Sequence, residues 1–212
     1  MIRPHRLARA VVRATWASVL AFAALPVGAA DRLTIEEEIA AANGKRWRAA
    51  YDLVLTPAEA AVEVRVRLIA GPGVRPVDLD RVKADWPGIV NRYWNRRIEI
   101  VAGDGRLRPL QVRLSFDERR PHHVIAVKEG GRGVHARSWP LSPERDTVIA
   151  HEFGHLIGAY DEYRGGGTAP GGSEMDPSGL MGVARGEAKA ERRHFWHVIK
   201  SVSVRVGGSR GS

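Results

Sequence analysis

The chain has 212 residues, 44% of them hydrophobic and 27% charged, which is an ordinary globular composition with enough length for one well-buried domain. It contains no cysteine, and this excludes disulfides, cysteine-ligated zinc and a thiol nucleophile. The formal net charge is +9, but the first 30 residues contribute four arginines, and the remainder carries 29 basic against 24 acidic residues, a charge of +5. Because no basic helix interleaved with aromatic residues accompanies this excess, we expect no nucleic-acid binding.

Residues 1–30 have the pattern of a secretory signal peptide. Four arginines are followed by an apolar run, Ala14–Leu25, and by a stretch of small residues, Pro26–Ala30. The alternative is an uncleaved membrane anchor, but about a dozen apolar residues are fewer than the roughly 20 that span a bilayer. We expect cleavage near Ala29 or Ala30 and a secreted or periplasmic protein, with no membrane span after signal removal.

The chain after residue 30 is expected to alternate between strands and helices. Asp31–Asn43 has acidic residues early and alanines later and ends at Asn43-Gly44, which predicts a short helix or a loose leader. Segments rich in β-branched residues, one of which alternates strictly from Val62 to Leu68, predict strands. The predicted strands are residues 51–55, 61–70, 97–101, 110–116 and 121–128.

Three longer helices are predicted. The first begins at Asp78, turns its tryptophans toward the core, and should kink or restart at Pro87. The second begins at Ser142-Pro143, with serine as the N-cap, and runs to about Ile157. The third covers residues 187–202, where apolar residues recur at helical spacing.

The remaining segments are predicted to be irregular. Arg164–Ser173 is rich in glycine and lacks periodicity, which predicts a mobile loop able to gate access to a neighbouring site. Residues 206–212 read as a flexible Gly/Ser tail. No internal repeat or linker divides the rest, so residues 31–205 are expected to form a single domain.

One motif in the second predicted helix describes a chemical reaction. His151 and His155 are four residues apart, so their imidazoles lie on one helix face and can bind a single zinc ion. Glu152 is placed to take a proton from metal-activated water and to return it to a leaving amine. The motif therefore indicates hydrolysis, although HExxH alone also occurs by chance as an ordinary polar helix face.

Two residues downstream of the motif strengthen the prediction of a metal site. Gly158 follows His155 by three residues, where the helix must end, and glycine accepts the left-handed conformation that such an end needs. Asp161 then arrives near the metal and supplies a third protein ligand. Three protein ligands leave one position for water, which is the form of a catalytic zinc site.

This pattern resembles the metzincin clan of zinc endopeptidases, whose motif is HExxHxxGxxH followed by a methionine turn. Aspartate in place of the last histidine, with a tyrosine two residues later, is similar to the snapalysin-like branch of small secreted bacterial proteases. The resemblance covers about His151–Met181 and the following helix, and it implies that Met181 lies under the metal without binding it. The residues on the pattern are His151, Glu152, His155, Gly158, Asp161 and Tyr163.

The aspartate has a physical consequence for catalysis. A carboxylate ligand lowers the charge of the zinc complex from +2 to +1, so the bound water should be acidified less than by three neutral imidazoles. More of the activation then falls to Glu152. Tyr163 is a candidate donor to the tetrahedral oxyanion, and the equally weighted alternative is a packing or supporting tyrosine.

Other residues compete for these roles. Glu174 has the distance from His155 of the third ligand in thermolysin-like enzymes, but its neighbours predict no helix to present it. Glu162 either binds metal or anchors the loop through a charge pair, and Met175 competes with Met181 for the methionine turn. The remaining histidines lack partner spacing and are interpreted as surface, packing or structural residues: His122, His123, His135, His194 and His197.

We expect an α/β or α+β fold of zincin type, a twisted, mixed and mostly parallel sheet backed by helices, with an active-site helix and a small C-terminal subdomain. The expected function is that of a monomeric, secreted zinc endopeptidase acting on a protein or peptide substrate. Val124–Lys128 would be the exposed edge strand that pairs with substrate, or else an interior strand. Alternative functions are a metal-dependent cell-wall peptidase or amidase and an inactive, zinc-stabilised binding module.

Overall fold

The computed structural model describes residues 31–130, 133–143, 145–171, 176–183 and 188–208. The predicted signal peptide lies outside the described residues, as do Glu174 and Met175. Among the described residues, no helix combines the length and the apolar character needed to cross a membrane.

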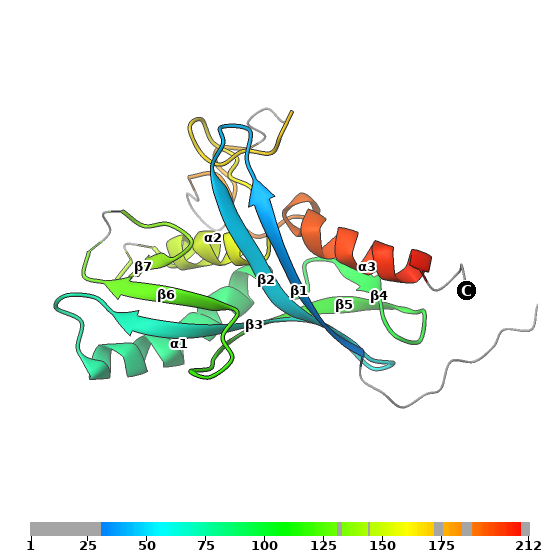
Figure 1. The fold of residues 1–212 in the computed structure, drawn as a ribbon, viewed down its shortest axis with the longest axis horizontal. Coiled ribbons are helices and arrows are strands. Elements are labelled where there is room, and N and C mark those ends of the chain that lie inside the picture. Colours follow the sequence, from blue (N-terminus) through cyan, green and yellow to red (C-terminus); the bar gives the residue numbers. More distant parts are fainter. Residues whose placement is uncertain (1–30, 131–132, 144, 172–175, 184–187, 209–212) are drawn as a thin grey trace, which may run out of the picture.

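A mixed, open sheet of seven strands occupies the centre of the part that the structure describes (Figure 1). The strands follow the order β1-β2-β3-β5-β4, while β6 pairs with the C-terminal part of β3 and β7 pairs with β6. Three of these pairings are antiparallel (β1–β2, β2–β3 and β4–β5) and three are parallel (β3–β5, β3–β6 and β6–β7), so the prediction of a mostly parallel sheet is wrong. The strands are β1 Asp31–Ala40, β2 Arg46–Leu55, β3 Ala60–Ala70, β4 Glu99–Val101, β5 Leu107–Phe116, β6 His123–Lys128 and β7 Ser138–Pro140.

Helices back this sheet, as the mixed α/β prediction requires. Helix α1 packs against β5 and against α2, and a short 3-10 helix, η1, leads directly into α3 near the C-terminus (Figure 1). Helix α1 runs through Pro87 without restarting. The helices are α1 Pro76–Trp94, α2 Asp146–Leu156, η1 Arg192–Phe195 and α3 Trp196–Gly208.

The predicted helix at Asp31–Asn43 is wrong, because β1 pairs along its whole length with β2. The register runs from Asp31 opposite Leu55 to Ala40 opposite Arg46. Gly44 has a φ of +82° and lies in the turn between the two strands. The glycine signal was therefore correct for a positive φ, but it marks a hairpin and not the end of a helix.

The boundaries of α2 and α3 also differ from the predictions. Helix α2 begins at Asp146, so the N-cap predicted at Ser142 is wrong. The unpredicted strand β7 explains the delay: Leu141 still donates its N–H to the Lys128 carbonyl at 2.7 Å, and the chain turns only after it. At the C-terminus, α3 continues to Gly208, so the start of the expected tail is helical.

Trp94 of α1 packs helix α2 against its neighbours. Trp94 is fully buried, and its indole N–H donates to the Ala150 carbonyl of α2 at 2.8 Å. Its ring lies 5.8 Å from that of Phe153 and 5.2 Å from that of Phe195. The prediction that the tryptophans of α1 are core residues is confirmed, and Trp94 joins α1, α2 and η1 in one apolar core.

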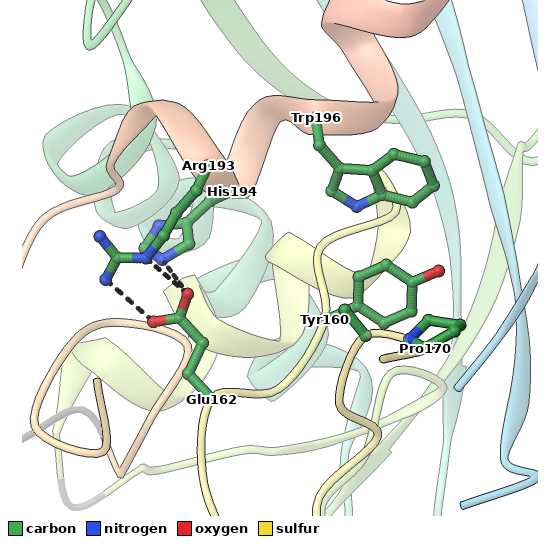
Figure 2. A pocket seen from close by; sticks show the side chains of 7 residues that line it. Tyr160, Glu162, Pro170, Arg193, His194 and Trp196 are labelled. Carbon is green, nitrogen blue, oxygen red and sulfur yellow. Dashed lines mark hydrogen bonds and ion pairs between the residues drawn. The ribbon is translucent and has the colours of Figure 1, made fainter. Parts of the chain in front are cut away.

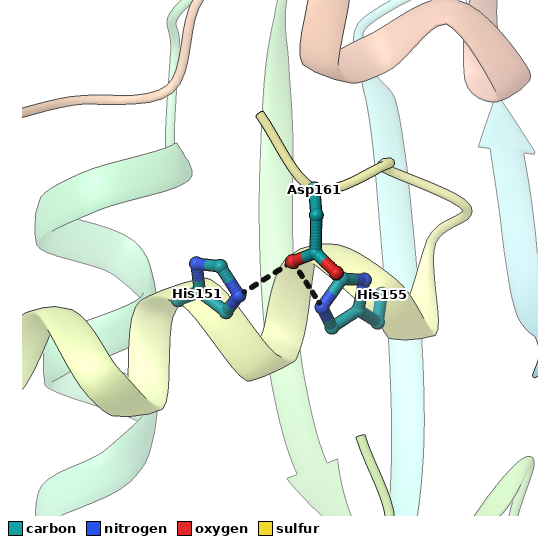
Figure 3. Close-up of side chains that lie close together, drawn as sticks. All are labelled: His151, His155 and Asp161. Atoms are coloured by element: carbon teal, nitrogen blue, oxygen red, sulfur yellow. Dashed lines mark ion pairs between the residues drawn. The ribbon is translucent and has the colours of Figure 1, made fainter. Parts of the chain in front are cut away.

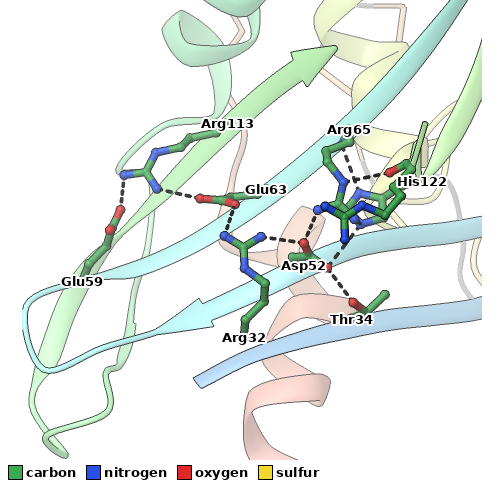
Figure 4. Close-up of polar contacts among 9 residues, drawn as sticks. Arg32, Thr34, Asp52, Glu59, Glu63, Arg65, Arg113 and His122 are labelled. Atoms are coloured by element: carbon green, nitrogen blue, oxygen red, sulfur yellow. Dashed lines mark hydrogen bonds and ion pairs between the residues drawn. The ribbon is translucent and has the colours of Figure 1, made fainter. Parts of the chain in front are cut away.

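A network of charged and polar side chains joins β1, β2 and β3 (Figure 4). Asp52 on β2 is 1% exposed and forms ion pairs with Arg32 of β1, at 2.6 Å, and with Arg65 of β3. Thr34 donates a hydrogen bond to it at 2.7 Å, and His122 Nε2 lies 3.3 Å from its carboxylate. Because a buried carboxylate is costly without partners, these contacts fix the base of the β1–β2 hairpin.

Candidate metal centre

His151 and His155 of α2 both direct their Nε2 atoms toward the Asp161 carboxylate. His151 donates its Nδ1–H to the Leu180 carbonyl at 2.9 Å, and His155 donates its Nδ1–H to the Ala159 carbonyl at 2.9 Å. A neutral imidazole that donates through Nδ1 presents only a lone pair at Nε2. The backbone carbonyls therefore fix both rings with Nε2 free to bind an ion, as in many metal-ligating histidines.

The chain turns back at Gly158 and brings Asp161 to these histidines. Gly158 has a φ of +94°, and a Cβ at this position would lie 2.8 Å from the Cβ of His197. Both the conformation and the close approach require glycine, as the sequence predicted for the conformation. The Ala159 N–H bonds to the Gly154 carbonyl at 2.9 Å and closes the helix end.

The three side chains form a buried group that could hold a metal ion (Figure 3). Asp161 Oδ1 lies 3.1 Å from His151 Nε2 and 3.3 Å from His155 Nε2. Neither contact has hydrogen-bond geometry, and Oδ1 is a buried oxygen without a hydrogen-bond partner in the part of the chain that the structure describes. Its other oxygen, Oδ2, accepts the Gly167 N–H at 2.5 Å.

The chemistry of this group fits a cation. Two imidazole lone pairs and a carboxylate oxygen converge, with one ligand atom of each residue within 4.8 Å of the others. Three acceptors at this distance need a proton or a positive ion between them. Nitrogen and oxygen donors of this kind suit a first-row transition metal ion, and three protein ligands leave a coordination position open.

Burial and neighbouring charges perturb the acids and bases of the site. Burial alone would raise the pKa of Asp161, but the imidazoles of His151 and His155 outweigh it and hold the pKa well below its usual range. Burial alone would lower the pKa of His155, but the Asp161 carboxylate outweighs it and the pKa is raised. Attraction between the carboxylate and the imidazoles therefore outweighs the effect of burial on these two pKa values.

Glu152 and Tyr163, the two residues with predicted catalytic roles, adjoin the metal group. Glu152 is 6% exposed, and its Oε2 is buried without a hydrogen-bond partner among the described residues. Burial raises its pKa, and the nearby histidines oppose this only in part. The half-buried ring of Tyr163 lies 6.2 Å from the ring of His151, and burial raises its pKa to about 12, so it keeps its proton at neutral pH.

Met181 packs against helix α2 at Gly154, in the helix turn that carries His151 and His155. It is fully buried, and its sulfur would be 2.6 Å from a Cβ added at Gly154 of α2. Its carbonyl accepts the Glu162 N–H at 2.7 Å, while the preceding carbonyl, that of Leu180, orients His151. The carbonyls of Leu180 and Met181 thus hold His151 on α2 and the backbone of Glu162 next to Asp161.

Glu162 does not join the metal group, and its side chain has other partners (Figure 2). It accepts two hydrogen bonds from Arg193, at 2.6 Å and 3.0 Å, and its carboxylate lies 3.3 Å from His194 Nε2. The interpretation as a charge pair that anchors the loop is confirmed. Beside it, the rings of Tyr160 and Trp196 stack at 5.3 Å and join the loop to α3.

The other histidines occupy structural positions or the surface, as predicted. His122 contacts the Asp52 network, whereas His123 bonds to the Ala50 carbonyl at 2.9 Å. His197 is buried between Tyr51 and Glu37, at 2.9 Å and 3.1 Å. His194 belongs to the Glu162 pair, and His135 is exposed.

The structure bears on two expectations about the surroundings of the site. Strand β6 pairs with β3 on one side and with β7 on the other, so Val124–Lys128 is not the exposed edge. The Arg164–Ser173 loop is irregular as expected in its described part, but Gly166 and Gly167 are buried against Asp161. The loop therefore forms a wall of the metal group.

The sequence reasoning missed one side chain of the site. Trp47, on β2, places its ring 5.5 Å from that of His155 and nearly perpendicular to it. No local pattern marks this residue, because it lies more than a hundred positions before the motif. Only the pairing of β1 with β2, which the sequence did not predict, would have indicated it.

Comparison of the chain with protein-family models, with curated proteins and with solved structures gives no significant match in any of the three. The metzincin resemblance therefore stays a prediction that rests on the motif and on the geometry described above.

Proposed function

We propose that this chain is a zinc-dependent endopeptidase, exported by its N-terminal segment and related in its active site to the metzincins. The observation that carries the proposal is the convergence of His151 Nε2, His155 Nε2 and Asp161 Oδ1 in a buried group. The carboxylate of Glu152 next to this group, whose Oε2 is buried without a hydrogen-bond partner among the described residues, adds a base to it. A structural zinc site, by contrast, is usually closed by four protein ligands.

His151, His155 and Asp161 would hold the zinc. When bound, zinc acts as a Lewis acid that polarises the scissile carbonyl and makes water more acidic. Gly167 steadies Asp161 through its N–H, and the carbonyls of Leu180 and Ala159 keep the two rings oriented. The protein thus supplies a fixed set of donors and does not have to reorganise them during the reaction.

Glu152 would act as the general base and then as the general acid. It takes one proton from the attacking water, whose oxygen forms a bond to the peptide carbon. As the carbon–nitrogen bond breaks, Glu152 returns this proton to the leaving amine. Its burial raises its pKa, which makes the carboxylate a stronger base for the first step.

Tyr163 would donate its hydroxyl proton in a hydrogen bond to the developing oxyanion. Its pKa of about 12 keeps the phenol protonated, and its ring lies beside that of His151. Replacement of Tyr163 by phenylalanine separates this role from packing, because phenylalanine retains the ring and loses only the donor. The catalytic role predicts a lower kcat with little change in stability.

The proposal is tested by comparing the wild type with Glu152→Gln for zinc content and for cleavage of an unfolded, casein-like protein. Retention of zinc with loss of hydrolysis is expected, because glutamine keeps the shape but cannot accept a proton. Equal hydrolysis by both proteins would contradict the mechanism. Purified peptidoglycan is the parallel substrate, and cleavage of peptidoglycan alone would move the function to the cell-wall alternative.

A further inference from the structure

The tip of the β1–β2 hairpin is joined to the glycine loop beside the metal group. The Ala42 N–H bonds to the Thr168 carbonyl at 2.9 Å, and the Asn43 side-chain amide donates to the Gly166 carbonyl at 2.7 Å. The Lys45 amino group also donates to the Gly165 carbonyl at 3.1 Å, so the hairpin tip contacts three residues of the loop: Gly165, Gly166 and Thr168. Hydrogen bonds from the hairpin tip therefore hold the backbone of the glycine loop.

The side chain of Trp47, on β2 of this hairpin, extends toward the proposed metal ligands. Its ring meets the His155 ring at 5.5 Å and the Tyr160 ring at 5.4 Å, both nearly edge to face. A Cβ at Gly167 would lie 3.2 Å from its Cζ3 atom, so any other residue at 167 would press on the indole. The Trp47 ring thus touches one ligand directly and touches the residue that holds another.

The indole nitrogen of Trp47 does not explain this position. It is buried and has no hydrogen-bond partner among the described residues. A buried donor without an acceptor costs about 1–3 kcal/mol, so hydrogen bonding does not favour this placement. The ring contacts with His155, Tyr160 and Gly167 must account for it.

We propose that the hairpin tip, chiefly through Trp47, positions two of the three metal ligands and so sets the affinity of the centre for zinc. Trp47 limits the rotation of the His155 ring, and it backs Gly167, whose N–H orients the Asp161 carboxylate. Trp47 is a positioning residue and does not itself bind the metal. The inference rests on the proposed zinc site and adds the element that preorganises it.

The test is the zinc dissociation constant, measured by competition with a chromophoric chelator at a temperature at which every variant is folded. Trp47→Ala should bind zinc roughly 10–100-fold more weakly, the usual effect of removing a residue that orients a ligand. Trp47→Phe should keep most of the affinity, because it retains an aromatic ring against His155.

Arg48→Ala is the matched control. Arg48 neighbours Trp47 on the same strand, is exposed, and pairs with Glu36 of β1, away from the glycine loop. It should bind zinc like the wild type. Asn43→Ala removes one hydrogen bond between the hairpin and the loop without touching the indole, and it should weaken zinc binding in the same direction by a smaller factor.

Cobalt substitution gives a second readout that does not depend on catalysis. The visible absorption of Co²⁺ reports the geometry of its ligands, so its spectrum should change in Trp47→Ala and not in Arg48→Ala. Unchanged zinc affinity and an unchanged cobalt spectrum in Trp47→Ala would reduce Trp47 to a packing residue and overturn the inference alone. Failure of the wild type to bind zinc would instead overturn the proposed function and the inference with it.

Discussion

Gly158 shows how one residue sets the end of helix α2. Its φ is +94°, and a Cβ would lie 2.8 Å from His197, which is itself held by Tyr51 at 2.9 Å. Gly105 is a matched position, with a φ of +78° and nothing within 4 Å of an added Cβ. Both glycines therefore adopt a left-handed backbone conformation, but only at Gly158 would a side chain also collide with a neighbour.

We expect Gly158→Ala to destabilise the fold by about 1–3 kcal/mol more than Gly105→Ala. Both variants bear the cost of a left-handed alanine, and the excess is the overpacking against His197. The free energy of unfolding in urea, measured for both, gives the difference. Equal losses would mean that His197 moves aside without cost.

Asp161 is the ligand that separates this site from its alternatives. Asp161→Ala should lose zinc, since it removes one of three protein donors and leaves the Gly167 N–H without its acceptor. Glu174→Ala should retain zinc. Metal content after dialysis, measured by atomic emission, distinguishes the two, and the reverse pattern would transfer the third ligand to Glu174.

At this scale, residues with local signals were predictable and residues brought by long-range pairing were not. The four-residue spacing of His151 and His155 follows from helix geometry, and both rings lie where that spacing puts them. Asp161 needed in addition a bend at Gly158, which glycine chemistry indicates. Trp47 carries no such signal, because its contact with His155 depends on a hairpin formed far earlier in the chain.

At the scale of elements, the Asp52 network tests how the hairpin is held to the sheet. Burial alone would raise the pKa of Asp52, but hydrogen bonds from Thr34, Arg65 and Arg32 outweigh it and hold the pKa well below its usual range. The unfolded chain therefore binds this proton first as the pH falls. The stabilisation is full above the unfolded pKa of about 3.9 and is lost as the pH falls toward the lower folded pKa.

Asp52→Asn should lower the free energy of unfolding by about 1–3 kcal/mol near neutral pH, the cost of leaving buried donors without their charged acceptor. The difference in unfolding free energy between wild type and variant should shrink between about pH 5 and about pH 3. In this range Asp52 takes up a proton when the wild type unfolds, which favours the unfolded wild type. Urea unfolding of both proteins across this range is the measurement. A gap independent of pH would show that Asp52 contributes by shape and not by charge.

Strands and helices with a clear hydrophobic repeat in their own sequence were predicted well, and those without one were not. Residues 61–70 alternate strictly, and β3 matches that segment within one residue. Residues 31–40 carry acids and alanines that favour a helix locally, but pairing with β2 along all ten positions overrides this preference. Strand β7 has only three residues, too few for a pattern, and it was missed together with the true start of α2.

At the scale of the whole molecule, metal binding should stabilise a fold that does not require it. The apolar core extends from β2 to α3 and is built without the metal group. Zinc that binds only the folded state adds about 4 kcal/mol at a free concentration a thousand times its Kd. For a chain of this size, that corresponds to a rise in Tm of roughly 8–16 °C.

Calorimetry with zinc and with a chelator measures this rise. The chelated protein should remain folded by circular dichroism, with a lower Tm. His151→Ala should be folded too, and its Tm should no longer respond to zinc. Complete unfolding on chelation would mean that the metal is needed for the fold, whereas a Tm indifferent to zinc would mean that the group binds none.

The central claim is that His151, His155 and Asp161 bind one zinc ion and leave a position open for the reaction. X-ray diffraction at the zinc absorption edge, from crystals of the zinc-loaded protein, tests it most directly. We expect one anomalous peak at about 2.0–2.2 Å from the two Nε2 atoms and from an Asp161 oxygen, with no fourth protein ligand. A peak elsewhere, or one that replaces Asp161 with Glu174, would contradict it.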